Sequence, residues 1–255
     1  MPEDRGLVAA RRNWSEDEVR KALALYLRLD FGKFHSRNPQ VIALGEMLGR
    51  TASAVALKLT NLAALDDSLP QKGMANASRT DRRVWTEFLR SPDPVLRAYE
   101  EQTRAHGLPT GFAERQAAFE ARQGEMHTSQ HARRLGQGFF REMILTSYRG
   151  RCALTGLDSP KLLTASHIVG WAEDSTARLD PSNGICLNAL HDRAFDRHLM
   201  TFDDDLRMMI APDLPEATQR QLRKGAAERL SMPSRFLPDP GFMSRHRARF
   251  HARLN

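Results

Sequence analysis

The sequence predicts an α+β fold, in which a mainly helical N-terminal half precedes a short segment that mixes strands and a helix. Apolar residues recur at helical spacing through the first 65 residues, and the composition changes near residue 135. Beyond that point, two short apolar runs flank a long irregular loop. Hydrophobic residues make up 41% of the 255 residues and charged residues 27%, which is typical of a globular protein.

The first helix is expected over residues 14–29, because Val19 and Leu23 continue an apolar stripe at helical spacing. Ser15 is a favourable N-cap, and Glu18 stands three residues later, where it can complete a capping box.

Two short helices should follow, joined by a tight turn. Pro39 can open the second helix in its first turn, and Gly49 can end it. The third helix would start at an N-cap formed by Thr51 or Ser53. Two short helices with a tight turn have the shape of a helix-turn-helix, so we expect residues 1–65 to form a helical domain of that type.

Trp14 and the stretch "GRTASAVALKL" resemble the Myb-like group of DNA-binding helical domains. In a helix-turn-helix the second helix of the motif enters the major groove. Arg50, Lys58 and Asn61 are the expected exposed contacts to DNA. An ordinary three-helix bundle without a nucleic-acid role remains the alternative.

Residues 66–132 are expected to form a helical linker region. "RRVWTEFLRS" predicts a short amphipathic helix, and the two prolines of "SPDP" predict a break after it. A polar, helical stretch is expected through residues 113–134, which could join two domains or pack against either one.

A compact unit is expected over residues 133–212. After a helix and a turn at Gly150, the pattern predicts a strand over 161–168, a long loop, a strand over 184–187 and a helix over 188–199. This order places His167 at the end of the first strand, Asn183 at the opening of the second and His191 early in the helix. A hairpin around the Asp-rich turn of "LMTFDDDLRMMIAP" should follow.

Three blocks of this unit, "GQGFFREMILTSYRGRCALTG", "ASHIVGW" and "NGICLNALHDRAFDRHLMTF", resemble the HNH endonucleases, and in particular their restriction-endonuclease branch. The resemblance implies a ββα-metal nuclease domain that uses a divalent metal ion, Mg²⁺ or alternatively Mn²⁺ or Ni²⁺. It implies that His167 is the general base, that Asn183 ties the loop and keeps the base aimed, and that His191 ligates the metal. Arg193 and Arg197 are candidate phosphate contacts on the same helix.

The sequence departs from the family pattern in its metal shell and in its cysteines. Ser166 stands where many HNH enzymes have an acid or a histidine that completes the metal shell, and serine is a weak ligand for a hard cation. Asp192 and Asp196 are the nearby carboxylates, at awkward angles from His191 for sharing one ion. Cys152 and Cys186 lack the partner cysteines of a zinc knuckle, so no structural zinc is expected.

The charge balance favours a polyanionic partner. The net charge is +7 and residues 213–255 form a basic C-terminal tail, which we expect to pack back or to touch phosphate. Together with this charge, the resemblance to the HNH endonucleases implies a cytoplasmic, metal-dependent DNA endonuclease of restriction type, and we expect a homodimer for double-strand cleavage and no membrane association. The alternative is a non-catalytic DNA-binding protein or regulator on a degenerate HNH scaffold. A basic RNA-binding adaptor is less favoured, since aromatic residues make up only 7%.

Overall fold

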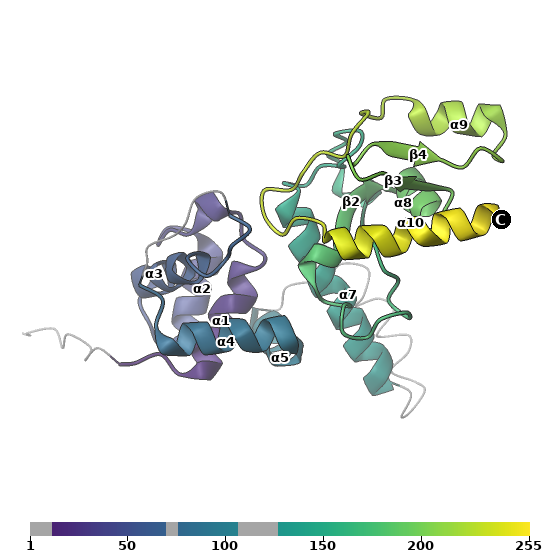
Figure 1. Cartoon of the computed structure of the whole chain (residues 1–255). Coiled ribbons are helices and arrows are strands. Elements are labelled where there is room, and N and C mark those ends of the chain that lie inside the picture. The colour runs from purple at the N-terminus through teal and green to yellow at the C-terminus, as the bar shows by residue number, and fades with distance from the viewer. Residues whose placement is uncertain (1–11, 70–75, 107–126) are drawn as a thin grey trace, which may run out of the picture.

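The computed structural model describes residues 12–69, 76–106 and 127–255. It contains a helical N-terminal part and a C-terminal part with two small sheets (Figure 1), so the mixed α+β architecture is confirmed. Part of the polar stretch expected to be helical, residues 113–126, lies outside the described residues. No helix in the described ranges is long and apolar enough to cross a membrane.

The three predicted N-terminal helices are present as α1 (Glu16–Tyr26), α2 (Pro39–Leu48) and α3 (Ala52–Ala63). The predicted capping box of α1 is confirmed, with Ser15 accepting from the Glu18 backbone and Glu18 accepting from the Ser15 backbone. Thr51 caps α3, and Gly49 ends α2 in the left-handed region at φ 60°. A short 3-10 turn, η1 (Phe31–Lys33), lies between α1 and α2.

Two further helices complete the helical part. α4 (Arg79–Arg90) forms where an amphipathic helix was predicted. α5 (Asp93–His106) begins within the predicted break, because Pro94 is tolerated in the first turn of a helix. Both pack against α1, burying Val84 and Phe88 of α4 and Tyr99 of α5. The packing of the helical part thus includes elements beyond residue 65.

The long helix α7 (His127–Ser147) lies between the helical part and the C-terminal sheets (Figure 1). On one side Tyr99 of α5 donates a hydrogen bond to Glu142. On the other side, buried Phe140 and Ile144 pack over the first hairpin, where a Cβ on Gly184 would overlap both side chains. α7 therefore packs against both the helical part and the first hairpin.

The hairpin consists of β1 (Leu163–His167), preceded by η2 (Pro160–Leu162), and β2 (Gly184–Asn188), preceded by η3 (Pro181–Asn183). The strands are antiparallel, with His167 opposite Gly184. α8 (Ala189–Asp196) follows β2 directly and packs against both strands. The predicted order of strand, loop, strand and helix is therefore confirmed.

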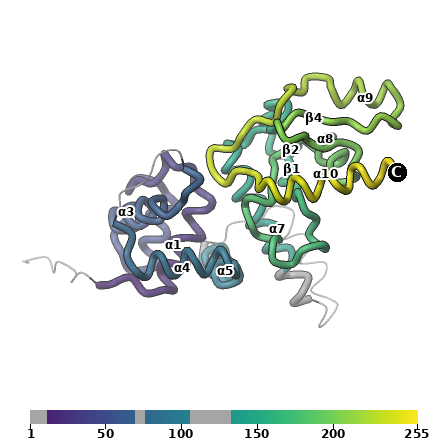
Figure 2. The backbone as a smooth tube through the Cα atoms, in the orientation of Figure 1, coloured from purple at the N-terminus to yellow at the C-terminus, as the bar shows by residue number. Residues whose placement is uncertain are grey.

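A second antiparallel hairpin, β3 (Met200–Phe202) and β4 (Met208–Ile210), encloses the Asp-rich turn as predicted. The tail forms α9 (Glu216–Arg223) and α10 (Pro240–Leu254), and α10 packs against β3. Between these helices the chain runs back toward the helical part (Figure 2). There Arg235 is fully buried and donates to the carbonyl oxygens of Tyr26 and Leu27 at 3.0 and 2.6 Å.

Candidate functional site

The first hairpin and α8 bring the three predicted residues into one small ββα unit. His167 is the last residue of β1, Asn183 immediately precedes β2, and His191 lies in the first turn of α8. Asn188 caps α8 by accepting hydrogen bonds from the backbone of Leu190 and His191, which starts the helix directly at the end of the strand.

His167 is half-buried in an aromatic setting. Its ring stacks on Phe140 with centroids 3.9 Å apart and meets the edge of Trp171 at 5.5 Å. Its Nε2 lies 3.0 Å from the carbonyl oxygen of Arg178, and a carbonyl can only accept, so Nε2 carries the proton and Nδ1 is left as an acceptor. Burial lowers the pKa of His167, with the Arg178 carbonyl opposing it. A neutral imidazole with a basic Nδ1 is the form that a general base requires.

Asn183 is buried and holds both ends of the loop that follows β1. Its Oδ1 accepts from the Val169 backbone at 2.8 Å, and its Nδ2 donates to the carbonyl oxygens of Val169 and Ala177, both at 3.0 Å. The loop contains Arg178, whose carbonyl meets His167. Through these bonds Asn183 fixes the backbone that orients the His167 ring.

His191 does not present a nitrogen to a metal ion in this structure, in contrast to the role implied by the resemblance. The residue is only 2% exposed, its Nε2 lies 2.9 Å from the Leu222 carbonyl oxygen, and its Nδ1 lies 3.0 Å from Asn188 Oδ1. Nε2 therefore donates to a carbonyl, and Nδ1 faces the oxygen that caps the helix. The ring connects α8 to the end of α9.

Asp192, the next residue, faces β1 instead. Ser166 donates to Asp192 Oδ1 at 2.6 Å, so the position next to His167 in sequence meets a carboxylate of α8. Burial raises the pKa of Asp192, while the Ser166 hydrogen bond opposes the shift. Asp196 is exposed and lies within ion-pair distance of Arg193 and Arg197.

Few side chains near α8 could ligate a metal ion. Within the described ranges, no group of three or more histidine, cysteine, aspartate or glutamate side chains could hold a metal ion. Asp192 and Ser166 supply two oxygen atoms, and Mg²⁺ in proteins is bound by one or two carboxylates with waters and substrate phosphates. Asp192 is thus the one carboxylate of the pair, which suits Mg²⁺ only where waters and substrate phosphates complete the shell, and the Ser166 hydroxyl adds a weak ligand.

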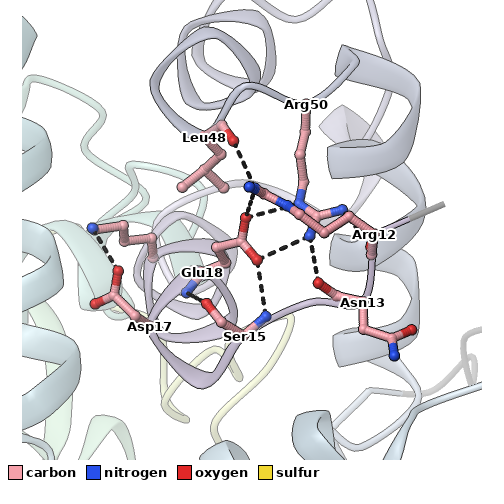
Figure 3. Close-up of polar contacts among 8 residues, drawn as sticks. Arg12, Asn13, Ser15, Asp17, Glu18, Leu48 and Arg50 are labelled. Atoms are coloured by element: carbon pink, nitrogen blue, oxygen red, sulfur yellow. Dashed lines mark hydrogen bonds and ion pairs between the residues drawn. The ribbon is translucent and has the colours of Figure 1, made fainter. Parts of the chain in front are cut away.

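Among the predicted DNA contacts, the expectation of exposure is wrong for Lys58 and Arg50. Lys58 is 5% exposed and forms an ion pair with the fully buried Asp81 at 2.6 Å, because both side chains face the interior between α3 and α4. Arg50 pairs with Glu18 at 2.9 Å and lies over the Trp14 ring at 4.2 Å. Figure 3 shows Glu18 held between Arg50 and Arg12.

Asn61 is partly buried, and its Oδ1 has no hydrogen-bond partner. Arg193 and Arg197 are largely exposed, with side chains 65% and 60% accessible, and can reach a ligand.

Cys152 and Cys186 are both buried thiols, and Cys152 Sγ accepts from the Asn188 backbone at 3.3 Å.

Two features of the site were missed from the sequence. The Arg178 carbonyl has no signature in the side-chain pattern. The burial of His191, however, had one, because His191, Ala194 and Phe195 form an i, i+3, i+4 stripe that is buried in the structure.

Residues 152–203 match the family model described as HNH endonuclease. The matched range contains β1, its loop, β2, α8 and β3, and therefore His167, Asn183, His191 and Asp192. It does not extend to the helical N-terminal part. No curated protein matches this chain. The C-terminal part thus carries an HNH endonuclease domain.

Proposed function

We propose that this chain is a metal-dependent DNA endonuclease that hydrolyses phosphodiester bonds. One observation carries the proposal: within the segment that matches the HNH endonucleases, His167 is held through Nε2 by the Arg178 carbonyl, so that Nδ1 is the basic atom. A histidine that is neutral, oriented and only half-buried is suited to take a proton from water.

In the proposed mechanism, His167 Nδ1 accepts a proton from the water that attacks the phosphorus atom. Phe140 and Trp171 hold the ring on two sides, and Asn183 fixes the loop behind it. Because the pKa of His167 is lowered, the base remains neutral at pH values where an exposed histidine would be protonated. Arg193 and Arg197 are proposed to contact phosphates beside the scissile bond.

Asp192, with the Ser166 hydroxyl, is proposed to hold the divalent ion in place of His191. When bound, such an ion stabilises the negative charge that develops on the phosphate and on the leaving oxygen. A cation beside Asp192 would also favour its ionised form, opposing the effect of burial on its pKa. Mg²⁺ is the proposed ion because the two side-chain donors are oxygen atoms.

We further propose a restriction-type role against foreign DNA in the cytoplasm. The restriction role is supported by the similarity of the three sequence blocks around His167, Asn183 and His191 to that branch of HNH enzymes. The cytoplasmic location is supported by the two unpaired thiols, which suit a reducing compartment. A homodimer is proposed because one site cuts one strand, and a double-strand break needs two.

The test is plasmid cleavage with Mg²⁺, Mn²⁺, Ni²⁺ or EDTA. Metal-dependent nicking is expected for the wild type, with loss in His167→Ala and retention in His35→Ala, a control at an exposed histidine of the helical part. Cleavage that is equal in wild type and His167→Ala would refute the assigned base. DNA binding without cleavage under every metal would instead support the non-catalytic alternative.

Metal binding is tested separately from activity, by titrating the full chain with Mn²⁺ in a calorimeter. Asp192→Asn should abolish the binding heat, whereas Asp196→Asn, on the same helix but exposed, should preserve it. Unchanged Mn²⁺ binding in Asp192→Asn would refute the assigned ligand.

A further inference from the structure

The helix predicted to read DNA does not provide the positive charge that DNA binding requires. Lys58 is the only basic residue in α3, and it is buried against Asp81. The exposed side chains of α3 include Ser53 and Leu57, which is 51% exposed. A phosphate-contacting surface of the helical part must therefore lie on another element.

α4 carries such a surface. At 100° per residue, Arg79, Arg82, Arg83, Thr86 and Arg90 lie within about 100° of one another around the helix. We call these five residues the α4 arginine face. All five are exposed, whereas Asp81, Val84 and Phe88 on the opposite side are buried. The helix thus separates core contacts from a continuous cationic stripe.

Three of these arginines have no acidic partner in the part of the chain that the structure describes. Arg83 pairs with Glu16, but among the described residues no ion pair or hydrogen bond involves the side chains of Arg79, Arg82 or Arg90. This contrasts with Arg20, Arg28 and Arg50 of the same part, which are all paired.

Glu87 lies beside the arginine face but already has a partner. Glu87 and Ser91 line a shallow depression together with Arg82, Arg83, Thr86 and Arg90. Glu87 accepts two hydrogen bonds from Arg20, at 2.8 and 3.1 Å, so it does not neutralise the face.

We propose that the α4 arginine face binds the sugar-phosphate backbone of duplex DNA; this inference rests on the proposed action of the chain on DNA. Eleven residues separate Arg79 from Arg90, so the stripe is about 16 Å long at 1.5 Å per residue. With one phosphate per about 3.4 Å of axis on each strand, it spans the backbone of roughly five base pairs. Arginine forks match phosphate oxygens, and the contact carries no base information.

The experiment measures binding of the full chain to a fluorescent duplex by anisotropy, in EDTA, as the salt concentration is varied. The test variant is Arg79→Gln/Arg82→Gln/Arg90→Gln. Its matched control is Arg37→Gln/Arg97→Gln/Lys224→Gln, which removes the same charge at exposed positions elsewhere. Because each lost phosphate contact reduces the slope of log K against log salt by about 0.9, the test variant should lose about 2.7 of that slope and the control much less.

A test variant that binds DNA like its control would overturn the proposal, and so would a wild type that does not bind DNA. Thermal unfolding checks that both variants fold, since all six changes are at exposed side chains. Because the assay needs no cleavage, it separates this inference from the catalytic one. Suppose that the wild type does not nick plasmid DNA and that the test variant shows a reduced salt slope of DNA binding. The arginine face would then be supported and the endonuclease activity refuted.

Discussion

Replacing Asn183 by alanine should destabilise the domain and release the loop that orients His167. The Asn183 side chain makes three hydrogen bonds, all to backbone groups of the buried residues Val169 and Ala177. Each bond contributes a net of roughly 1 kcal/mol, so the free energy of unfolding should fall by about 3 kcal/mol. The loss is larger if a backbone group that has lost its partner stays buried without a hydrogen bond to water. Since domains are stable by about 5–15 kcal/mol, this is a large fraction.

Urea unfolding followed by tryptophan fluorescence measures this change, because Trp171 lies in the loop itself. Ser182→Ala is the matched control: it removes one hydrogen bond to the neighbouring Asp180 on the same turn, and it should cost under about 1 kcal/mol. Asn183→Asp should be no better than the alanine variant at neutral pH, because a carboxylate oxygen would face two carbonyl oxygens. A loss in Asn183→Ala as small as in the control would refute the reasoning.

Three further changes test the packing. Acid should destabilise the chain through His246, because burial lowers the pKa of this residue to about 4. As the pH falls, the unfolded state binds the proton first, so the free energy of unfolding should fall by about 3 kcal/mol between about pH 6.5 and pH 4. In urea titrations the His246→Phe variant should show a shallower fall over the same range. Lys58→Met should cost about 3 kcal/mol by chemical denaturation, because it leaves Asp81 buried without its cation; a loss below 1 kcal/mol would contradict the buried pair. Gly184→Ala should lower the unfolding free energy by about 1–3 kcal/mol, since a Cβ would overlap Ile144, and an unchanged melting temperature would count against that close approach.

Local signals were enough to predict most elements of this fold, but not α9 and α10, since residues 213–255 were expected only as a basic tail. The capping pattern of Ser15 and Glu18 lies within one turn, and Gly49 at the end of α2 acts on its own backbone. The strand that ends at His167 and the turn at Asn183 are likewise encoded by neighbouring residues. Such features depend on contacts a few residues apart, which a sequence shows directly.

The errors came from contacts between distant residues. Arg50 and Lys58 looked available for DNA because their partners, Glu18 and Asp81, are 32 and 23 residues away in sequence. Periodicity alone gives the angle between two positions of α8 but not which of them faces β1. Only the packing of α8 on the hairpin shows that Asp192 faces Ser166 of β1 while His191 faces the Leu222 carbonyl oxygen.

The path of Arg235 has a consequence for the order of assembly during synthesis. This guanidinium caps the carbonyl oxygens that end α1, yet it is made more than 200 residues after Tyr26 and Leu27. His246, which stacks on Phe195 in α8, is made later still. A nascent chain that already contains His167 and Asp192 thus still lacks the contacts of Arg235 with the end of α1 and of His246 with α8. The proposed hydrolytic centre therefore matures only after residues 235–246 have been made.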